Sequence, residues 1–161
     1  MTAINNTLPR SEGEISRVNQ AQQIQSMINT GATSMNPGLV VVADGTNDKG
    51  MVYPSTALDV MGGILVRDIR QGDTTGAAPV AQNQVGAVIK MGYVMCKCVN
   101  GTPVDGAQVF YRYTLGATGG TTRPVGSIEA AAIANEVIAL SGANFNGTMD
   151  ENSLVEVRIN L

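Results

Sequence analysis

NSLVEVRINL, residues 152–161, alternates apolar and polar side chains up to its last residue. Val155, Val157 and Ile159 fall on one parity, and Leu161 continues it. A period of two is that of a β-strand with one buried face and one solvated face. Chain ends are usually polar and loosely held unless a sheet holds them in place. The stretch therefore predicts a closing β-strand and places Leu161 in a core or an interface.

From Leu39 onward the chain contains further short segments with strand character, separated by turns rich in Gly, Pro and Asn. Gly92 interrupts the longest segment, and we expect it to form a bulge that bends this segment into two strands. Short strands between such turns are typical of an antiparallel sheet protein. We predict an all-β fold, a jelly-roll-like antiparallel β sandwich or barrel. The segments are LVVVA (39–43), GILVRDI (63–69), VGAVIKMGYVMCKCV (85–99), GAQVFYRYT (106–114) and EVIAL (136–140). In the longest one, a single parity is shared by Val85, Ala87, Ile89, Met91, Tyr93 and Met95.

Residues 1–37 differ from the rest because Gln, Asn and Ser are frequent there. Their apolar residues follow a loose helical spacing that Gln22 and Gln25 interrupt. We expect an N-terminal arm over residues 1–37, extended or partly helical, and a β domain over residues 38–161. An amphipathic helix packed on its own domain is an equal alternative. The apolar residues of the arm are Ile15, Val18, Ile24, Met27 and Ile28.

The surface is expected to be unusually neutral, because charged residues make up 14% of the chain where about a quarter is usual. Such a surface is common on proteins that lie against neighbours, and a low-charge secreted domain or lectin is the alternative. The ten Lys and Arg residues are scattered, which predicts no nucleic-acid partner. No apolar run approaches the ~20 residues that span a bilayer, which predicts no membrane partner. The N-terminus lacks a secretion signal, so we expect synthesis in the cytoplasm.

The composition also argues against catalysis. The chain has no histidine, which removes the usual member of triads, proton shuttles and many zinc sites. Cys96 and Cys98 are expected to be buried, reduced thiols. DGTNDKG (44–50) resembles a calcium loop only in part, because Lys49 stands where its glycine belongs, and GATGG (116–120) lacks a phosphate loop's lysine. We predict no enzyme activity, no metal and no cofactor.

Five short stretches, in this order, resemble the structural cement proteins of tailed bacteriophages. They are GILVRDI (63–69), VDGAQVFYRYT (104–114), VGSIEA (125–130), GANF (142–145) and SLVEVRINL (153–161). In that family a glycine precedes a strand that ends in valine, arginine and aspartate, and the stretch from Gly63 to Asp68 fits this pattern. The chain departs from the family at Asp105-Gly106-Ala107, where members tend to carry Gly-Asp-Pro.

The resemblance implies a jelly-roll-like domain that binds the outer surface of an icosahedral head. Such a cement, or decoration, protein bridges major capsid protein subunits and stabilises the head. It implies two partners, the major capsid protein and the chain itself as a dimer or trimer, and a location on the capsid exterior after assembly in the host cytoplasm. We expect the arm residues Ile15, Val18, Ile24, Met27 and Ile28 to contact the capsid. The alternative is a carbohydrate-binding or adhesin-like β-sandwich module, although the chain has no Trp and only 4 Tyr to present to sugars.

Overall fold

The computed structural model describes residues 12–17, 21–67, 79–115 and 123–161, and every element in them is a β-strand. The all-β class predicted from the sequence is therefore confirmed. The strands form one nine-stranded sheet in the order β1-β3-β2-β4-β5-β9-β8-β6-β7, with an additional β1–β5 pairing. The strands are β1 (Gln23–Asn29), β2 (Val40–Ala43), β3 (Gly50–Val52), β4 (Met61–Val66), β5 (Val85–Lys97), β6 (Gln108–Arg112), β7 (Ile128–Glu129), β8 (Val137–Phe145) and β9 (Leu154–Asn160).

The additional β1–β5 pairing closes β1, β3, β2, β4 and the first half of β5 into a small barrel, which we call the first ring. Its pairings are antiparallel except for β1 with β3, which is parallel. The sheet is thus mixed, whereas the sequence predicted an antiparallel one. An apolar cluster lies inside the ring, because alternate residues of each strand point inward. That cluster includes Met27, Val41, Met51, Leu65 and Val88.

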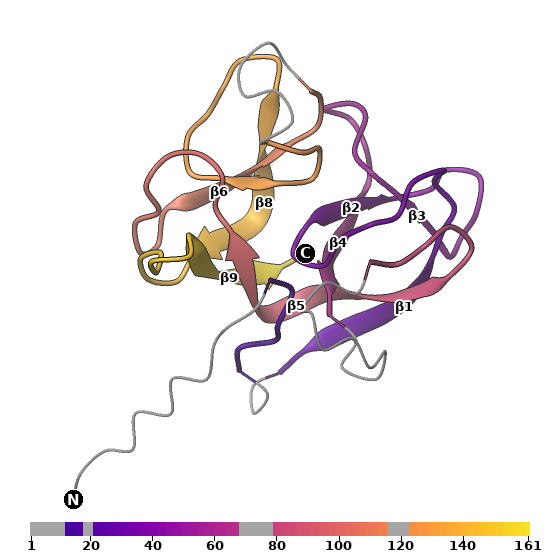
Figure 1. Ribbon diagram of the computed structural model, residues 1–161, viewed down its shortest axis with the longest axis horizontal. Helices are drawn as coiled ribbons and strands as arrows, with labels where there is room; N and C mark the ends of the chain where they lie inside the picture. Colours follow the sequence, from indigo (N-terminus) through magenta and orange to yellow (C-terminus); the bar gives the residue numbers. More distant parts are fainter. Residues whose placement is uncertain (1–11, 18–20, 68–78, 116–122) are drawn as a thin grey trace, which may run out of the picture.

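The second half of β5 begins another set of pairings, with β9, β8, β6 and β7. A parallel bridge between Cys98 and Ile128 connects β7 to the residue that follows β5 and so closes this set of strands. The Val99 amide donates to the Ile128 carbonyl at 3.0 Å. We call this set the second ring. Figure 1 shows β1–β4 on one side of the molecule and β6, β8 and β9 on the other, with β5 extending from the first side to the second. One strand of 13 residues therefore belongs to both rings.

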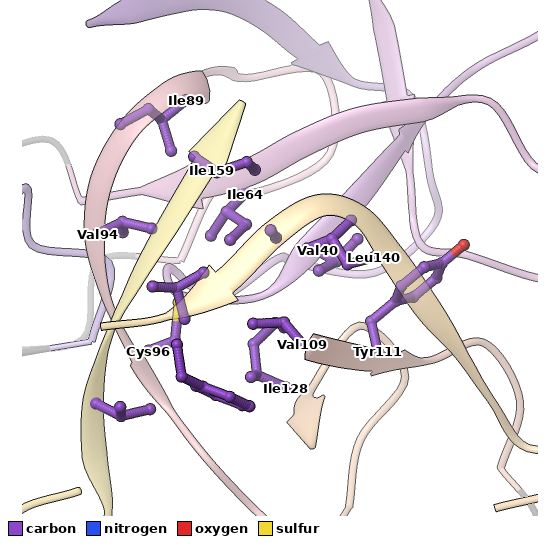
Figure 2. Packing of buried hydrophobic residues seen from close by; sticks show 14 of the residues in the cluster. Val40, Ile64, Ile89, Val94, Cys96, Val109, Tyr111, Ile128, Leu140 and Ile159 are labelled. Carbon is purple, nitrogen blue, oxygen red and sulfur yellow. The ribbon is translucent and has the colours of Figure 1, made fainter. Parts of the chain in front are cut away.

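The larger core lies in the second ring and extends to the outer side of the first. Figure 2 shows residues from both rings in this core, with Val40, Ile64 and Ile89 from the first ring and Val109 and Leu140 from the second. Simple alternation along β5 would put Ile89 and Val94 on opposite faces, yet both belong to this core. The alternation of inward and outward side chains is broken between them. Gly92 has a φ of +135°, and the pairing of β5 with β1 shifts register between Gln23 and Ile24. The segment is therefore irregular near Gly92, as expected, but it stays one continuous strand rather than two, and that strand contributes to two cores.

The closing strand β9 carries the predicted alternation into this core. Val155, Val157 and Ile159 are all buried. Glu156, on the opposite parity, is buried as well, because the N-terminal segment covers that face. Leu161 is 40% exposed, and its amide donates to the Lys90 carbonyl at 2.9 Å. The last residue is thus held by the backbone and lies at the surface of this chain.

The described N-terminal residues are extended, so of the two predicted forms of the arm the extended one holds for them and the partly helical one does not. Residues 23–29 form β1, which pairs with both β3 and β5. Residues 12–17 form a strap along β5: the Gly13 amide donates to the Met95 carbonyl at 2.8 Å, and the Met95 amide donates to the Glu14 carbonyl at 2.8 Å. The reason is that β5 offers unpaired backbone groups, which an adjacent extended segment satisfies. The domain boundary at residue 37 and the jelly-roll arrangement stay predictions.

Candidate functional site

The residues predicted to contact a capsid separate into different environments. Ile24 and Ile28 point outward from β1, whereas Met27 is buried inside the first ring. Ile15, in the strap, bridges to Val94 and packs half-buried against the larger core. Val18 lies outside the described residues. The helical spacing had placed these side chains on one face, but a strand sends Met27 and Ile28 to opposite faces.

Ile24 and Ile28 are part of an outward apolar strip, which we call the β1 face and which Val85 completes. Ile28 pairs with Val85 in the antiparallel register, and directly paired residues point to the same side of a sheet. Ile24 is 46% exposed and Val85 is 57% exposed. The sequence did not identify Val85 as exposed, because Val85 shares its strand parity with Ile89 and was expected to be buried with it. The β1 face is an apolar surface suited to a macromolecular contact.

The strap is held to the sheet by a polar clip around Glu156. The Arg17 guanidinium donates from Nε at 3.2 Å and from Nη2 at 2.7 Å to the two carboxylate oxygens. It also lies 4.4 Å from the centre of the Tyr93 ring, within the range of a cation–π contact. The Asn146 amide donates to the same carboxylate. Glu156 thus links the strap and β9 to Asn146, which follows β8, and Arg17 links the strap to β5 through Tyr93.

The clip should make stability depend on acid pH. Burial favours the neutral form of Glu156, but the hydrogen bonds from Arg17 and Asn146 outweigh it and lower its pKa below the ordinary 4.5. A lowered pKa contributes stability above the unfolded-state value, and this contribution is lost as pH falls through the folded-state value. We expect Arg17→Met to lose at most about 1 kcal/mol at pH 7, because Arg17 is partly exposed.

This difference should vanish near pH 2, and urea unfolding of both proteins at several pH values measures it. Arg158→Met removes an exposed arginine from the same strand as Glu156 and serves as the control. An equal loss for Arg17→Met at pH 2 and pH 7 would show that the clip acts through packing alone.

A second ionic cluster is buried around Arg112. Arg112, at the end of β6, donates from Nε to Glu129 and from Nη1 to Glu136, each at 2.7 Å. The Asn100 amide donates to the other oxygen of Glu129 at 2.9 Å. Burial acts to lower the pKa of Arg112, but the two carboxylates outweigh it and raise that pKa. The cluster joins β6, β7 and the start of β8, so its role is to define the second ring.

The β3–β4 loop presents an apolar tip on a rigid frame. The Asp59 carboxylate accepts from the Ser55 amide at 2.6 Å, from the Thr56 amide at 2.9 Å and from the Thr56 hydroxyl at 2.8 Å. Between these residues Leu58 is 92% exposed. Sequence reasoning did not single out this loop, because a lone leucine in a polar stretch carries no periodicity.

The cysteines and the loop that resembles a calcium site have structural roles. Cys96 and Cys98 are free and buried, and burial raises the pKa of both thiols, which keeps them protonated and unreactive. Asp44 closes an exposed turn by accepting from the Thr46 amide at 2.9 Å. In the described ranges no three His, Cys, Asp or Glu side chains gather as metal ligands would. GATGG (116–120) lies outside the described residues.

In the part of the chain that the structure describes, no helix has the length and hydropathy that a membrane crossing needs.

The comparisons with known proteins identify both a fold and a family for this chain. A solved chain from the capsid of Myoviridae phage XM1 has the same fold, with a TM-score of 0.69 and 17% identity over 99% of this chain and 98% of that chain. No curated protein matches the sequence. The sequence and fold together define a tailed-phage capsid-associated structural protein of the virion, which confirms the predicted class. The chain belongs to the XM1 gp53 minor capsid protein family, whose model matches residues 1–159.

Proposed function

We propose that the protein is a cement protein that binds the outer surface of the phage head and bridges major capsid protein subunits. The observation that carries the proposal is membership of a minor capsid protein family over residues 1–159. The role needs no reaction, only a stable surface that fits a lattice. In the described part of the chain, the buried side chains form apolar clusters and ion pairs that hold the fold together, which is consistent with such a role.

The two rings suit such a role because they keep strand edges paired. Exposed edges promote uncontrolled sheet addition between chains, and closure of both rings leaves side chains as the means of contact. The β1 face, with Ile24, Ile28 and Val85, supplies one apolar contact that the fold does not use internally. We propose this face as the capsid contact. Among the residues expected from the sequence, Met27 and Ile15 act indirectly, by holding β1 and the strap in place.

The energetic effect on the head follows from mass action. A protein that binds the assembled shell and not its free subunits stabilises the shell. A contact of ~1,000–2,000 Å² is modest, but a dimer or trimer that spans several subunits gains effective concentration. Synthesis in the host cytoplasm and binding from outside, after the shell has formed, complete the proposal.

The test compares phage heads that lack the protein with the same heads after addition of the purified chain. We expect saturable binding in sedimentation and release of packaged DNA at a higher temperature. The double variant Ile24→Lys, Val85→Lys should bind at least about tenfold more weakly, because burying each apolar side chain contributes ~1.5–3 kcal/mol.

Val104→Lys changes an exposed valine outside the β1 face and should bind as the parent does. Heads that withstand heat equally well with and without the protein would refute the cement function. Normal binding by the double variant would refute the β1 face as the contact.

A further inference from the structure

A surface hollow outside the β1 face lies between the strap and the second ring. Glu12 of the strap lines it together with Lys97, at the end of β5, and Ser127, which precedes β7. Its volume of about 180 Å³ is below the ~300–1,000 Å³ typical of small-molecule pockets. The hollow therefore has the size for one side chain of a partner and not for a cofactor.

Two hydrogen-bonding groups in this hollow lack partners within the described part of the chain. Ser127 is buried, with 1% of its surface exposed, and its hydroxyl makes no hydrogen bond within the described residues. The Glu12 carboxylate is half-buried and is attracted by Lys97, but no described residue forms a hydrogen bond or ion pair with it. A buried acceptor without a donor, and a carboxylate without a close cation, are both unfavourable.

The apolar part of the lining restricts which donor fits. Leu39, Val99 and Pro124 form the apolar part of the wall, and Asn36 and Gly38 complete the lining. The apolar part suits the methylene stem of a long basic side chain. A guanidinium is planar, stays charged and carries several N–H donors, so it can serve a carboxylate and a hydroxyl together. An ammonium presents a smaller and more strongly hydrated charge.

We propose that this hollow binds one arginine side chain of a neighbouring capsid protein, with its guanidinium donating to Glu12 and Ser127. The nature of the neighbour rests on the proposed function, whereas the chemistry of the hollow does not. Arginine would displace the exposed Lys97 from its place beside Glu12 and add direct hydrogen bonds that Lys97 does not make.

The state of Glu12 agrees with this assignment. Burial raises the pKa of its carboxyl above the ordinary value, and the charge of Lys97 opposes that shift. The nearby Cys96 thiol is fully buried and neutral, so it supplies no charge. A bound guanidinium should lower the pKa of Glu12, because a close positive charge favours the ionised carboxylate.

The first experiment is an NMR titration of the whole chain at pH 7 with N-acetyl-arginine methylamide. The uncharged analogue N-acetyl-citrulline methylamide has nearly the same shape and is the control ligand. We expect saturable shifts of the amide signals of Gly38 and Ser127 with arginine and none with citrulline. Equal shifts with both ligands, or no shift with arginine, would overturn the proposal.

Three variants locate the binding. Glu12→Gln should weaken arginine binding about tenfold, as expected for loss of a charge-assisted hydrogen bond. Ser127→Ala should weaken it less, and it tests the site independently of how Glu12→Gln folds. Glu151→Gln removes an exposed carboxylate from a turn and should bind as the parent does. Unchanged affinity in both hollow variants would overturn the site.

Head binding separates this inference from the proposed function. If the parent binds arginine but not heads, the hollow stands and the cement function fails. If Glu12→Gln and Ser127→Ala bind heads as the parent does while the parent binds heads well, the cement function stands and the hollow as a capsid contact fails.

Discussion

Replacing Arg112 by methionine is expected to lower the free energy of unfolding by about 3–5 kcal/mol, the loss typical when one partner of a buried ion pair is removed. Arg112 is buried, and its guanidinium holds Glu129 and Glu136 at 2.7 Å each. Methionine keeps much of the stem and its packing but removes the positive charge. Two enclosed carboxylates would then lie close together without that cation. Chemical denaturation followed by far-UV circular dichroism measures the effect.

Arg158→Met is the matched control, because Arg158 is an exposed arginine on β9. We expect it to change stability by no more than about 0.5 kcal/mol. A third protein, with Arg112→Met, Glu129→Gln and Glu136→Gln together, removes all three charges and should recover part of the loss. If Arg112→Met alone stays within 1 kcal/mol of the parent, the cluster does not hold the second ring together through its charges.

The second large effect is expected at Gly63, in the strand β4 of the first ring. Its φ of +137° is one that side-chain-bearing residues rarely adopt. A Cβ atom there would lie 2.4 Å from the Ile89 carbonyl oxygen and 2.7 Å from a methyl group of Val88. Both atoms belong to β5, the strand that the two rings share. Gly63→Ala therefore forces β4 and β5 apart, and we expect a loss of about 2–5 kcal/mol from backbone strain and overpacking.

Gly45→Ala is the control for this substitution. Gly45 lies in the exposed turn after β2, and a Cβ there meets nothing within 4 Å. Its unfolding midpoint in urea should stay close to that of the parent, whereas that of Gly63→Ala should fall sharply. A Gly63→Ala protein as stable as the Gly45→Ala protein would show that the contact between β4 and β5 relaxes easily.

The sequence was informative wherever local pattern decides structure. Alternation in residues 154–160 predicted β9, and the run 39–43 predicted a buried strand that became β2. The pattern was misleading for residues 23–29, where apolar spacing suggested a helix. A strand forms there because β3 and β5 both offer hydrogen-bond partners, and those partners are distant in sequence. Propensity over so short a segment is weaker than such tertiary pairing.

The candidate sites depend even more on tertiary structure than the strands do. Ile24 and Ile28 were identifiable as apolar residues, but Val85 joins them only through the β1–β5 register. The hollow is harder still to foresee, since Glu12 and Ser127 are brought together by the strap and by the return of the chain to the end of β5. No local signal in either residue indicates the other.

By itself, the sequence determined the all-β class, the closing strand, the buried thiols and the likeness to tailed-phage capsid proteins, because these depend on side-chain type and on periods of a few residues. Only the tertiary structure decided that the strands close into two rings sharing β5, that Arg112 and Glu156 are buried in ion pairs, and which apolar residues stay outside. Those features depend on backbone hydrogen bonds and charge pairs between segments up to 139 residues apart, and the energy of such contacts exists only once the chain has folded.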